Sequence, residues 1–478
     1  MPASSNIAAK LWSLCHILRD DGVSYQDYVT ELTFLLFLKM LAERGDEFEQ
    51  KLPRGSRWGD LNGRDGVDQL AFYRELLVKL GNEGDGRVLE IFQNAGTSIR
   101  EPRILTKLVT DIDALDWYSV DKENLGDLYE DLLERNAAER KSGAGQYFTP
   151  RPLIDAMVAV MQPQPGELIQ DPAAGTGGFL IAADRYIKER TDDLFDLSEK
   201  EQTFQRQEAL HAVELVPDTH RLLLMNALLH GIDSPHLKLG DSLSPLGERL
   251  PPADLILTNP PFGTRTGGGR PTRDDFTFPT GNKQLAFLQH IYRGLKPRGR
   301  AAVVLPDNVL FEEGKGSEIR ADLMDKCDLH TILRLPTGIF YAQGVKTNVL
   351  FFTRGRTPEH NTSAVWFYDL RTNMPSFGKR TPLTRDHFAE FEAAYGDQPD
   401  GSAARTDQGE EGRLRRYDRD AIRDRGDNLD ITWLRDENAE RAEDLDPPEE
   451  IAAQIQAKLA EAMAEMEELT VMLETTDV

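Results

Sequence analysis

The four residues Asn259-Pro260-Pro261-Phe262 combine groups that can hold and stack a planar amine. Consecutive prolines fix the backbone and lack N–H donors, so we expect the Pro260 carbonyl to stay outside helix or ladder pairing. The side-chain oxygen of Asn259 supplies a second acceptor, and Phe262 offers a flat face for a base. Two acceptors on an exocyclic amine would direct its nitrogen lone pair at an electrophilic methyl group. The motif therefore favours methyl transfer to an amine, with an ordinary proline-rich turn as the alternative.

A second candidate site is the loop Asp171–Leu180, which reads Asp-Pro-Ala-Ala-Gly-Thr-Gly-Gly-Phe-Leu. Small residues let the backbone approach a ligand, and glycine permits a tight turn; a plain strand-to-helix turn would look the same. The loop begins with Asp171-Pro172 and is not the G-x-G-x-x-G of dinucleotide enzymes. An acid there suits a ligand with an amine, such as the methionine part of S-adenosylmethionine. Glu214, at the end of the next expected strand, can accept ribose hydroxyls or be an ordinary surface carboxylate.

The elements that must position these motifs alternate between short apolar runs and helical segments. This alternation predicts an α/β fold with a doubly wound, mostly parallel, Rossmann-like sheet, whose strands bind ligands at their carboxyl ends. The polar stretch Thr191–Gln207 is expected to be an inserted loop. The expected strands are Leu168–Asp171, Leu210–Glu214, Leu237–Leu239, Leu255–Thr258, Ala301–Leu305, Thr331–Leu335 and Thr347–Thr353. The expected helices there include Leu153–Met161, Phe179–Arg190, Asp218–His230 and Gln284–Leu295.

The sequence as a whole suggests four parts. Residues 1–140 form an N-terminal helical domain, in which Tyr28–Leu41 and Asp68–Leu80 have apolar residues at three- and four-residue spacing. Residues 141–355 form the catalytic domain, whose sheet is expected to end near Thr353. Residues 356–446 are mixed and charge-rich. Residues 447–478 begin with two prolines and read as an amphipathic C-terminal helix with an apolar stripe from Ile451 to Leu473.

Composition restricts the class of protein. No apolar stretch approaches the ~20 residues of a membrane span, and the two cysteines, Cys15 and Cys327, lie far apart. Without a signal-peptide pattern, a cytoplasmic protein is expected. Methyl transfer needs no metal, and the sequence contains no H-E-x-x-H and no Walker A loop. The net charge of −25 is unfavourable for a chain that binds DNA alone, because phosphate contacts need Lys and Arg.

Taken together, these motifs resemble the amino-methyltransferases, and more closely the modification (M) subunits of type I restriction-modification systems. Small departures are Ala174, where many relatives carry Cys, and Thr176, which is often Ser. The resemblance covers most of the chain and rests on Leu18–Met40, Gly145–Arg151, Asp171–Leu180, Glu214, Met225–Ile232, Gly240–Ser242, Asn259–Phe262, Leu305–Asp307 and Gly338–Phe340 to Asn348–Phe352.

The resemblance implies an S-adenosylmethionine-dependent DNA adenine-N6 methyltransferase. It implies that Asn259, Pro260, Pro261 and Phe262 serve the target base, that Glu214 holds the cofactor ribose, and that Asp241 lies near the cofactor adenine. The other implied cofactor-binding residues are Gln146, Tyr147, Phe148, Thr149, Pro150, Arg151, Asp171, Ala173, Gly175, Thr176, Gly177, Gly178 and Phe179.

The resemblance also implies partners, which would account for the acidic charge. A separate specificity (S) subunit selects the DNA site, a helicase-nuclease restriction (R) subunit joins for cleavage, and the complex holds a second copy of this chain. The helix at 447–478 is expected to dock on the specificity subunit, or else to cover its own core. Arg265, Arg270 and Arg273 either guide DNA or belong to a solvated surface loop.

Two alternatives remain at this stage. Methyltransferases of RNA guanine-N2 or of protein glutamine also use Asn-Pro-Pro followed by an aromatic residue, although the long helical domain and the segment Gln146–Arg151 argue against them. A catalytically idle scaffold that binds the cofactor as a structural ligand is the second alternative. The intact motif Asn259–Phe262 argues against the scaffold.

Overall fold

The structure is a computed structural model that describes residues 10, 25–45, 49–50, 52–84, 86–115, 117, 129–130, 149–262, 273–340, 345–375, 377–378 and 381–435. The chain divides into two units, Met1–Trp433 and Leu434–Val478. Almost all of the second unit, including the predicted helix at 447–478, lies outside the described residues. No described helix is long and apolar enough to cross a membrane.

The N-terminal part is helical, as the apolar spacing predicted. Its helices are α2 (Tyr25–Arg44), α4 (Trp58–Asn62), α5 (Gly66–Glu83), α6 (Arg87–Phe92) and α7 (Pro102–Asp113). The carboxylate of Asp113 holds three of them together, because it accepts hydrogen bonds from Lys39 Nζ and Trp58 Nε1, each at 2.8 Å, and from Asn62 Nδ2 at 2.9 Å. Apolar side chains between the helices, such as Leu36 and Leu77, are fully buried.

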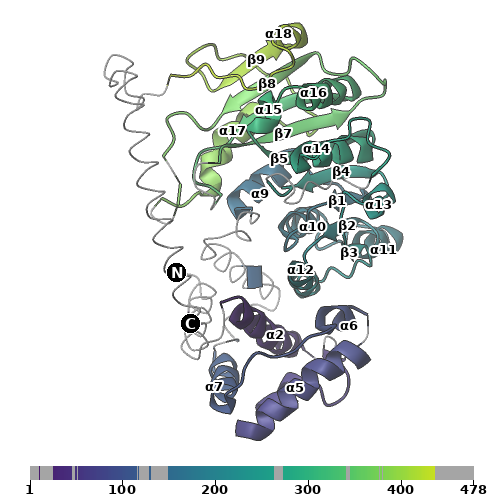
Figure 1. Cartoon of the computed structure of the whole chain (residues 1–478), viewed down its shortest axis with the longest axis vertical. Helices are drawn as coiled ribbons and strands as arrows, with labels where there is room; N and C mark the ends of the chain where they lie inside the picture. The colour runs from purple at the N-terminus through teal and green to yellow at the C-terminus, as the bar shows by residue number, and fades with distance from the viewer. Residues whose placement is uncertain are drawn as a thin grey trace, which may run out of the picture. The chain divides into compact units, whose positions relative to one another are not determined.

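The rest of the described chain is built on one nine-stranded sheet (Figure 1), with the order β3-β2-β1-β4-β5-β7-β6-β8-β9. Its strands are β1 (Ile169–Asp171), β2 (Leu210–Glu214), β3 (Leu237–Leu239), β4 (Ala253–Thr258), β5 (Leu295–Pro306), β6 (Cys327–Arg334), β7 (Thr347–Arg354), β8 (Ala364–Asp369) and β9 (Leu414–Asp418). The first five strands pair in parallel. Strand β7 runs antiparallel between β5 and β6, and β9 runs antiparallel to β8.

Helices cover both faces of this sheet, and the strand side chains alternate between them with the period of two that a strand imposes. Leu255 and Leu257 of β4 belong to one hydrophobic cluster, whereas Ile256 belongs to the other. The first cluster includes α9 (Arg151–Met161), α10 (Gly178–Arg190) and α12 (Pro217–Leu229). The second includes α14 (Lys283–Gly294), α15 (Asn308–Phe311) and α16 (Lys315–Lys326).

The N-terminal helices contact this domain through α12. A guanidinium nitrogen of Arg44, at the end of α2, donates to the carbonyls of Leu228 and Leu229. In the other direction, Arg221 on α12 donates to the carbonyls of Ile91, at 2.8 Å, and Gln93, at 3.2 Å. Charged donors thereby satisfy carbonyls near the ends of α12 and α6, which lack partners within their own helices.

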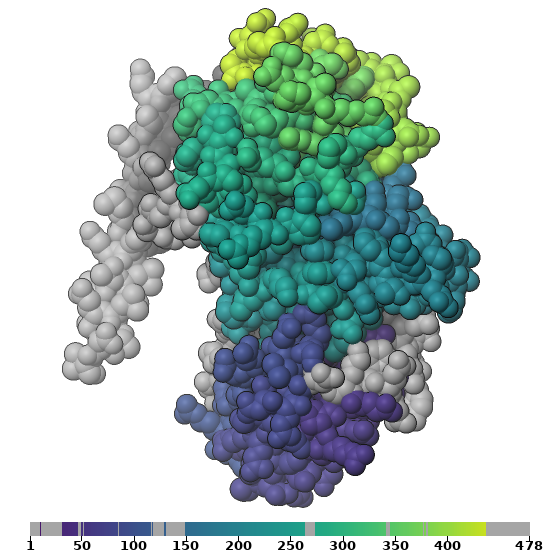
Figure 2. Space-filling view, turned by 90° about the vertical axis from the view of Figure 1, so that its right-hand side faces the viewer, coloured from purple at the N-terminus to yellow at the C-terminus, as the bar shows by residue number. Residues whose placement is uncertain are grey.

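Two expectations from the sequence were wrong. The sheet does not end near Thr353, because β8 pairs with β6 and β9 pairs with β8, which brings residues up to Asp418 into the same sheet. Figure 2 shows the described green and yellow residues as a continuous surface with the teal ones. The stretch Thr191–Gln207 is not only a loop, because it contains the helix α11 (Glu199–Gln207). Ser198 and Glu201 form the capping box of that helix.

Candidate active site

Three neighbouring strands bring the predicted chemical residues to one edge of the sheet. Strand β1 pairs in parallel with both β2 and β4, so their carboxyl ends meet at the same edge. Asp171 ends β1, Glu214 ends β2, and Asn259 directly follows β4. The structure therefore places these three predicted site residues, far apart in sequence, around one edge.

The glycine loop between β1 and α10 needs glycine at two positions. Gly177 has φ +90°, a conformation that strains any residue with a side chain, and a Cβ atom there would also lie 2.5 Å from Leu223 Cδ1 of α12, so that leucine would have to shift. Gly175 also has a positive φ, +55°, but a Cβ atom there would meet nothing within 4 Å. The loop thus leaves open space on the side of Gly175.

Glu214 fixes the shape of that loop. Its Oε2 accepts a hydrogen bond from the Gly175 backbone N–H at 2.9 Å, and its Oε1 accepts one from the N–H of Val216 at 2.8 Å. Burial raises the pKa of the Glu214 carboxyl, while these backbone hydrogen bonds oppose the rise. A carboxylate oxygen accepts more than one hydrogen bond, so Glu214 can order the loop and still receive hydroxyl groups.

Asp171 is buried beneath the loop, with 1% of its surface exposed. Its Oδ1 accepts from the backbone N–H of Ala173 at 3.1 Å. Burial raises the pKa of Asp171 to about 7, against the effect of its hydrogen bonds, and the nearby charge of Glu214 adds to the rise. Asp171 therefore supports the turn that starts the loop.

The two polar atoms of the Asn259 amide differ in their hydrogen bonding. Its Nδ2 donates to Thr149 Oγ1 at 2.9 Å, whereas its Oδ1 is buried and accepts no hydrogen bond from the described residues. The residue is 5% exposed. Because a buried acceptor without a partner is costly, the free oxygen marks a position where a ligand donor would complete the site. The hydrogen bond to Thr149 decides which end of the amide faces that position.

Phe262 stands beside this asparagine with one side packed on protein. Its ring contacts Phe340 edge-to-face, with ring centroids 5.9 Å apart and planes at 81°. Phe262 is only partly buried, so part of its surface remains available to a flat ligand. From the described residues, no hydrogen bond reaches the Pro260 carbonyl.

Comparisons with known proteins agree with this geometry. A model of the N-6 DNA methylase family matches residues 120–443, and a model of the HsdM N-terminal domain matches residues 7–133. The chain belongs to the N-6 DNA methylase family. It is 52% identical to the type I restriction enzyme StySPI methylase subunit of Salmonella potsdam, over 98% of this chain and 95% of that one. It is 51% identical to the EcoKI methylase subunit of Escherichia coli K12, over 99% of this chain and 96% of that one.

Solved structures give the same result. The crystal structure of the EcoKI M protein matches with a TM-score of 0.59 at 48% identity, covering 98% of this chain and 96% of that chain. A chain from a structure of type I restriction-modification complex assembly matches with a TM-score of 0.73 at 28% identity, covering 98% of both. The resemblance to type I modification subunits, the α/β fold class and the enzyme class, an adenine-specific DNA methyltransferase, are thereby confirmed.

Other predicted residues of this N-6 DNA methylase occupy varied positions. Gln146, Tyr147 and Phe148 lie outside the described residues. Phe179 is a core residue, 3% exposed. Asp241 lies near the glycine loop, because the hydroxyl of its neighbour Ser242 donates to the Pro172 carbonyl at 2.6 Å. A Cβ atom at Gly178 would lie 2.9 Å from Ile154 Cδ1, so a larger residue there would have to displace the Ile154 side chain of α9.

A buried polar chain behind the loop was missed by the sequence reading. Asn226 on α12 is 1% exposed, and its Nδ2 donates to the Thr176 carbonyl at 3.0 Å and to Glu130 Oε1 at 3.4 Å. Glu130 also pairs with Arg151. The guanidinium of Arg151, predicted to meet the cofactor, is thus tied to a carboxylate behind the loop. No local spacing reveals such contacts, because Glu130 and Asn226 are 96 residues apart.

Arg273, interpreted from the sequence as a DNA guide or as part of a solvated surface loop, is instead a buried residue in an ion pair. Its side chain is 4% exposed and forms an ion pair with Asp275 at 2.5 Å. The same guanidinium contacts the Ser242 carbonyl at 3.2 Å and His290 Nδ1 at 2.9 Å. Arg273 therefore joins the loop to α14. Arg265 and Arg270 lie outside the described residues.

Proposed function

We propose that this chain transfers a methyl group from S-adenosylmethionine to the N6 amine of adenine in DNA, with Asn259 as the residue that receives the amine. The observation that carries the proposal is the buried, unpartnered Oδ1 of Asn259, beside an Nδ2 already engaged by Thr149. An exocyclic amine donates hydrogen bonds, so it complements a free acceptor and not a free donor.

The residues at the glycine loop fit the cofactor. Gly175 faces open space, and Glu214 keeps acceptor capacity at the adjoining strand end. We propose that the backbone of Gly175, Thr176, Gly177 and Gly178 lies against the cofactor, that Glu214 holds the ribose hydroxyls, and that Asp241 lies near the adenine. Gln146, Tyr147, Phe148, Thr149 and Pro150 are proposed for the methionine end. When bound, the cofactor supplies an electrophilic methyl group, which is carried on a positively charged sulfur.

The protein's own part in the reaction is to position a base and its amine. Asn259 Oδ1 and the Pro260 carbonyl would accept the two amine hydrogens, and this fixes the direction of the nitrogen lone pair. Pro261 keeps the backbone of the motif rigid, and Phe262 would stack on the base, which must leave the duplex to reach a buried site. Alignment of this kind accelerates a reaction because reacting atoms are held near their attack geometry.

The two alternatives from the sequence have less support. The relatives over nearly the whole chain are methylase subunits of type I restriction enzymes, which favours DNA over RNA or protein as the substrate. An idle scaffold would have no use for a rigid motif with an unpartnered acceptor. Labelled S-adenosylmethionine, offered with duplex DNA, RNA or protein to the complex of this chain with its specificity subunit, tests the substrate class. We expect label only in DNA, in N6-methyladenine, and label in RNA or protein alone would refute the proposal.

We further propose that a partner brings DNA to the site. The net charge of −25 disfavours DNA binding by the chain alone. A specificity subunit would supply site selection, a restriction subunit would join the complex, and a second copy of this chain would serve the other strand. The proposed dock for the specificity subunit is the predicted helix at 447–478, which lies outside the described residues.

Reconstitution tests the proposed partner. The isolated chain should bind S-adenosylmethionine but methylate DNA negligibly, and addition of the specificity subunit should confer site-specific methylation. Deletion of residues 449–478 should impair assembly, measured by size-exclusion chromatography with light scattering, and leave cofactor binding intact. Complete assembly by the truncated chain would exclude the docking helix, and efficient methylation by the isolated chain would exclude dependence on a partner.

A further inference from the structure

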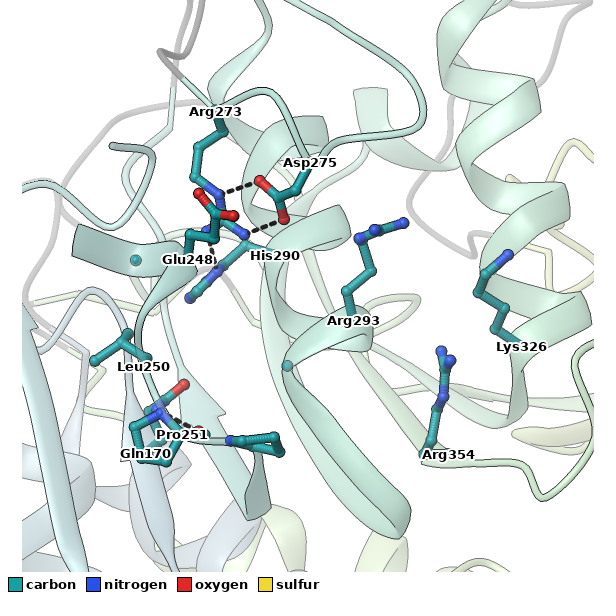
Figure 3. Close-up of a pocket in the computed structure, with 13 residues that line it drawn as sticks. Gln170, Glu248, Leu250, Pro251, Arg273, Asp275, His290, Arg293, Lys326 and Arg354 are labelled. Carbon is teal, nitrogen blue, oxygen red and sulfur yellow. Dashed lines mark hydrogen bonds and ion pairs between the residues drawn. The ribbon is translucent and has the colours of Figure 1, made fainter. Parts of the chain in front are cut away.

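A cavity of about 360 Å³ lies at the edge of the sheet opposite the Asn259 motif (Figure 3). Its lining includes Pro251 and Pro252, which lead into β4, and Gly294, which leads into β5. It also includes Arg354, the last residue of the antiparallel strand β7. These positions mark the amino ends of the parallel strands, whereas Asn259 follows a carboxyl end. The cavity is therefore separate from the proposed catalytic site, although its size falls in the range of small-molecule sites.

Three basic side chains from three different elements enter this cavity: Arg293 from α14, Lys326 from α16 and Arg354 from β7. Figure 3 shows them on one side of the cavity, across from Glu248 and His290. All three are half-buried. In a chain with a net charge of −25, a half-buried cluster of cations needs a physical reason.

Two of these cations have no carboxylate partner within 4 Å in the described part of the chain. Arg293 donates to the neutral hydroxyl of Thr277 at 2.8 Å, and Arg354 donates to the carbonyl of Tyr292 at 3.1 Å. Only Lys326 has an ion pair, with Asp322. The guanidinium groups of Arg293 and Arg354 thus retain N–H donors that no carboxylate of the described residues accepts.

The acids of the lining do not neutralise them. Both carboxylate oxygens of Asp275 accept from Arg273, at 2.6 and 2.5 Å, so the direct hydrogen bonds of this carboxylate go to another cation. Glu248 is exposed to solvent. The side of the cavity formed by Arg293 and Arg354 is therefore positive, with hydrogen-bond donors that lack an acceptor.

We propose that this cavity binds a phosphate group, held by Arg293 and Arg354 with Lys326 at its rim. Guanidinium groups present planar forks of donors that match phosphate oxygens, and an ammonium adds a point charge. Among the described residues, no phenylalanine, tyrosine or tryptophan lines the cavity, and its one aromatic ring, the imidazole of His290, is already in contact with Arg273. We therefore take the phosphate as the recognised group. Two sources have this chemistry: a free phosphate or phosphorylated small molecule, and the backbone of DNA bound to the assembled complex.

Calorimetric titration of the full chain with inorganic phosphate, at constant ionic strength maintained with sodium chloride, tests the site. The variant Arg293→Gln/Arg354→Gln removes both guanidinium groups. The control Arg103→Gln/Arg206→Gln makes the same charge change at two exposed positions outside the cavity. We expect one phosphate per chain for the parent and the control, and binding weakened about tenfold or more in the cavity variant. Unchanged cofactor binding would show that the variant is folded.

Two results would overturn the proposal: no phosphate binding by the parent beyond that of chloride, or equal binding by the parent and the cavity variant. A second arm identifies the source. If DNA supplies the phosphate, the cavity variant in the assembled complex should bind duplex DNA with a salt dependence reduced by about one to two counterions. If a free phosphate is the ligand, DNA binding by the variant complex should equal that of the control complex while phosphate binding is lost.

Discussion

Two residues at the same edge of the sheet, Asn259 after β4 and Asp307 after β5, have opposite surroundings. The Asp307 carboxylate accepts two hydrogen bonds from Arg371, both at 2.8 Å, and one from Asn348 Nδ2 at 2.8 Å. Asn259 Oδ1, one parallel strand away, accepts none. Both residues are largely buried, so exposure does not explain the difference. The three protein hydrogen bonds of Asp307 assign it to the scaffold, whereas the oxygen of Asn259, next to the glycine loop, is available to a ligand.

Arg371 makes further hydrogen bonds to the backbone around Asp307. Besides Asp307, it donates to the carbonyls of Leu335 at 3.0 Å and Thr347 at 2.8 Å. It therefore joins the edge ends of β5, β6 and β7 around one guanidinium. Although burial opposes the change, Arg371 holds the pKa of Asp307 below its ordinary value. This ion pair stabilises the fold beside the active site without facing a ligand.

The largest effect on activity is expected at Asn259, the residue proposed to face the ligand. Asn259→Ala removes the free acceptor, and methylation by the complex with its specificity subunit should fall by about a hundredfold or more, because the amine loses both a hydrogen bond and its alignment. Cofactor affinity should change little, and the melting temperature should fall only slightly, because the one hydrogen bond lost among the described residues is that from Nδ2 to Thr149. Methylation near the parental rate would refute the role of Asn259.

On the scaffold side, Arg371→Met should produce the reverse pattern. Loss of the guanidinium leaves the buried Asp307 carboxylate without its charged partner, and we expect the free energy of unfolding to fall by about 3 kcal/mol. Cofactor affinity, measured well below the melting temperature, should be retained. Arg103→Met, at a position 82% exposed, is the control and should leave urea unfolding unchanged. Equal stability of the two variants would mean that the Asp307 pair is not structural.

Asp171, at the same edge of the sheet, should make the stability of the protein depend on pH. Because burial raises the pKa of Asp171 to about 7, the folded state holds its proton more tightly than the unfolded state. Its contribution to stability is therefore complete at low pH and is lost as pH rises through about 7. We expect Asp171→Asn to become more stable relative to the parent by on the order of 2 kcal/mol between about pH 4 and pH 6. Parallel stability curves for the two proteins would contradict the raised pKa.

The smallest effect concerns the group that orients Asn259. Thr149→Val keeps the shape of the side chain but removes the oxygen that accepts from Nδ2. We expect kcat to fall about tenfold, since the amide loses a hydrogen bond that selects its orientation. Thr149→Ser keeps the hydroxyl and should restore most of the rate. If Thr149→Val instead weakens cofactor binding and leaves kcat unchanged, Thr149 serves the cofactor and not the asparagine.

Much of the ligand side could be predicted from the sequence, because its signals are local. The motif Asn259-Pro260-Pro261-Phe262 and the glycine loop are each made of consecutive residues, and each follows an apolar run that forms a strand. The scaffold side was harder to predict. Strand β9, with the sequence Leu-Arg-Arg-Tyr-Asp, is a charged edge strand, as edges that avoid unwanted pairing often are. Its charges concealed it among charge-rich neighbours, whereas the apolar run of β8, Ala-Val-Trp-Phe-Tyr-Asp, was visible in the sequence.

Contacts between distant side chains could not be predicted at all. The hydrogen bond from Asn259 to Thr149 spans 110 residues, and nothing in either motif specifies which end of the amide is engaged. Arg273 is another example, because a basic residue in a polar loop looks free until Asp275 and His290 are seen around it. Helix α11 differs from these cases, since its Ser-x-x-Glu capping box was visible in the sequence.

The most direct measurement is a structure of the complex between this chain, its specificity subunit, a cofactor analogue and DNA that contains the target adenine. We predict that the adenine N6 lies within hydrogen-bond distance of Asn259 Oδ1, at about 2.7–3.2 Å, while Nδ2 stays on Thr149. An adenine bound with its amine away from Asn259, or an amide that turns Nδ2 toward the base, would contradict the assignment of the free oxygen as the acceptor of the target amine.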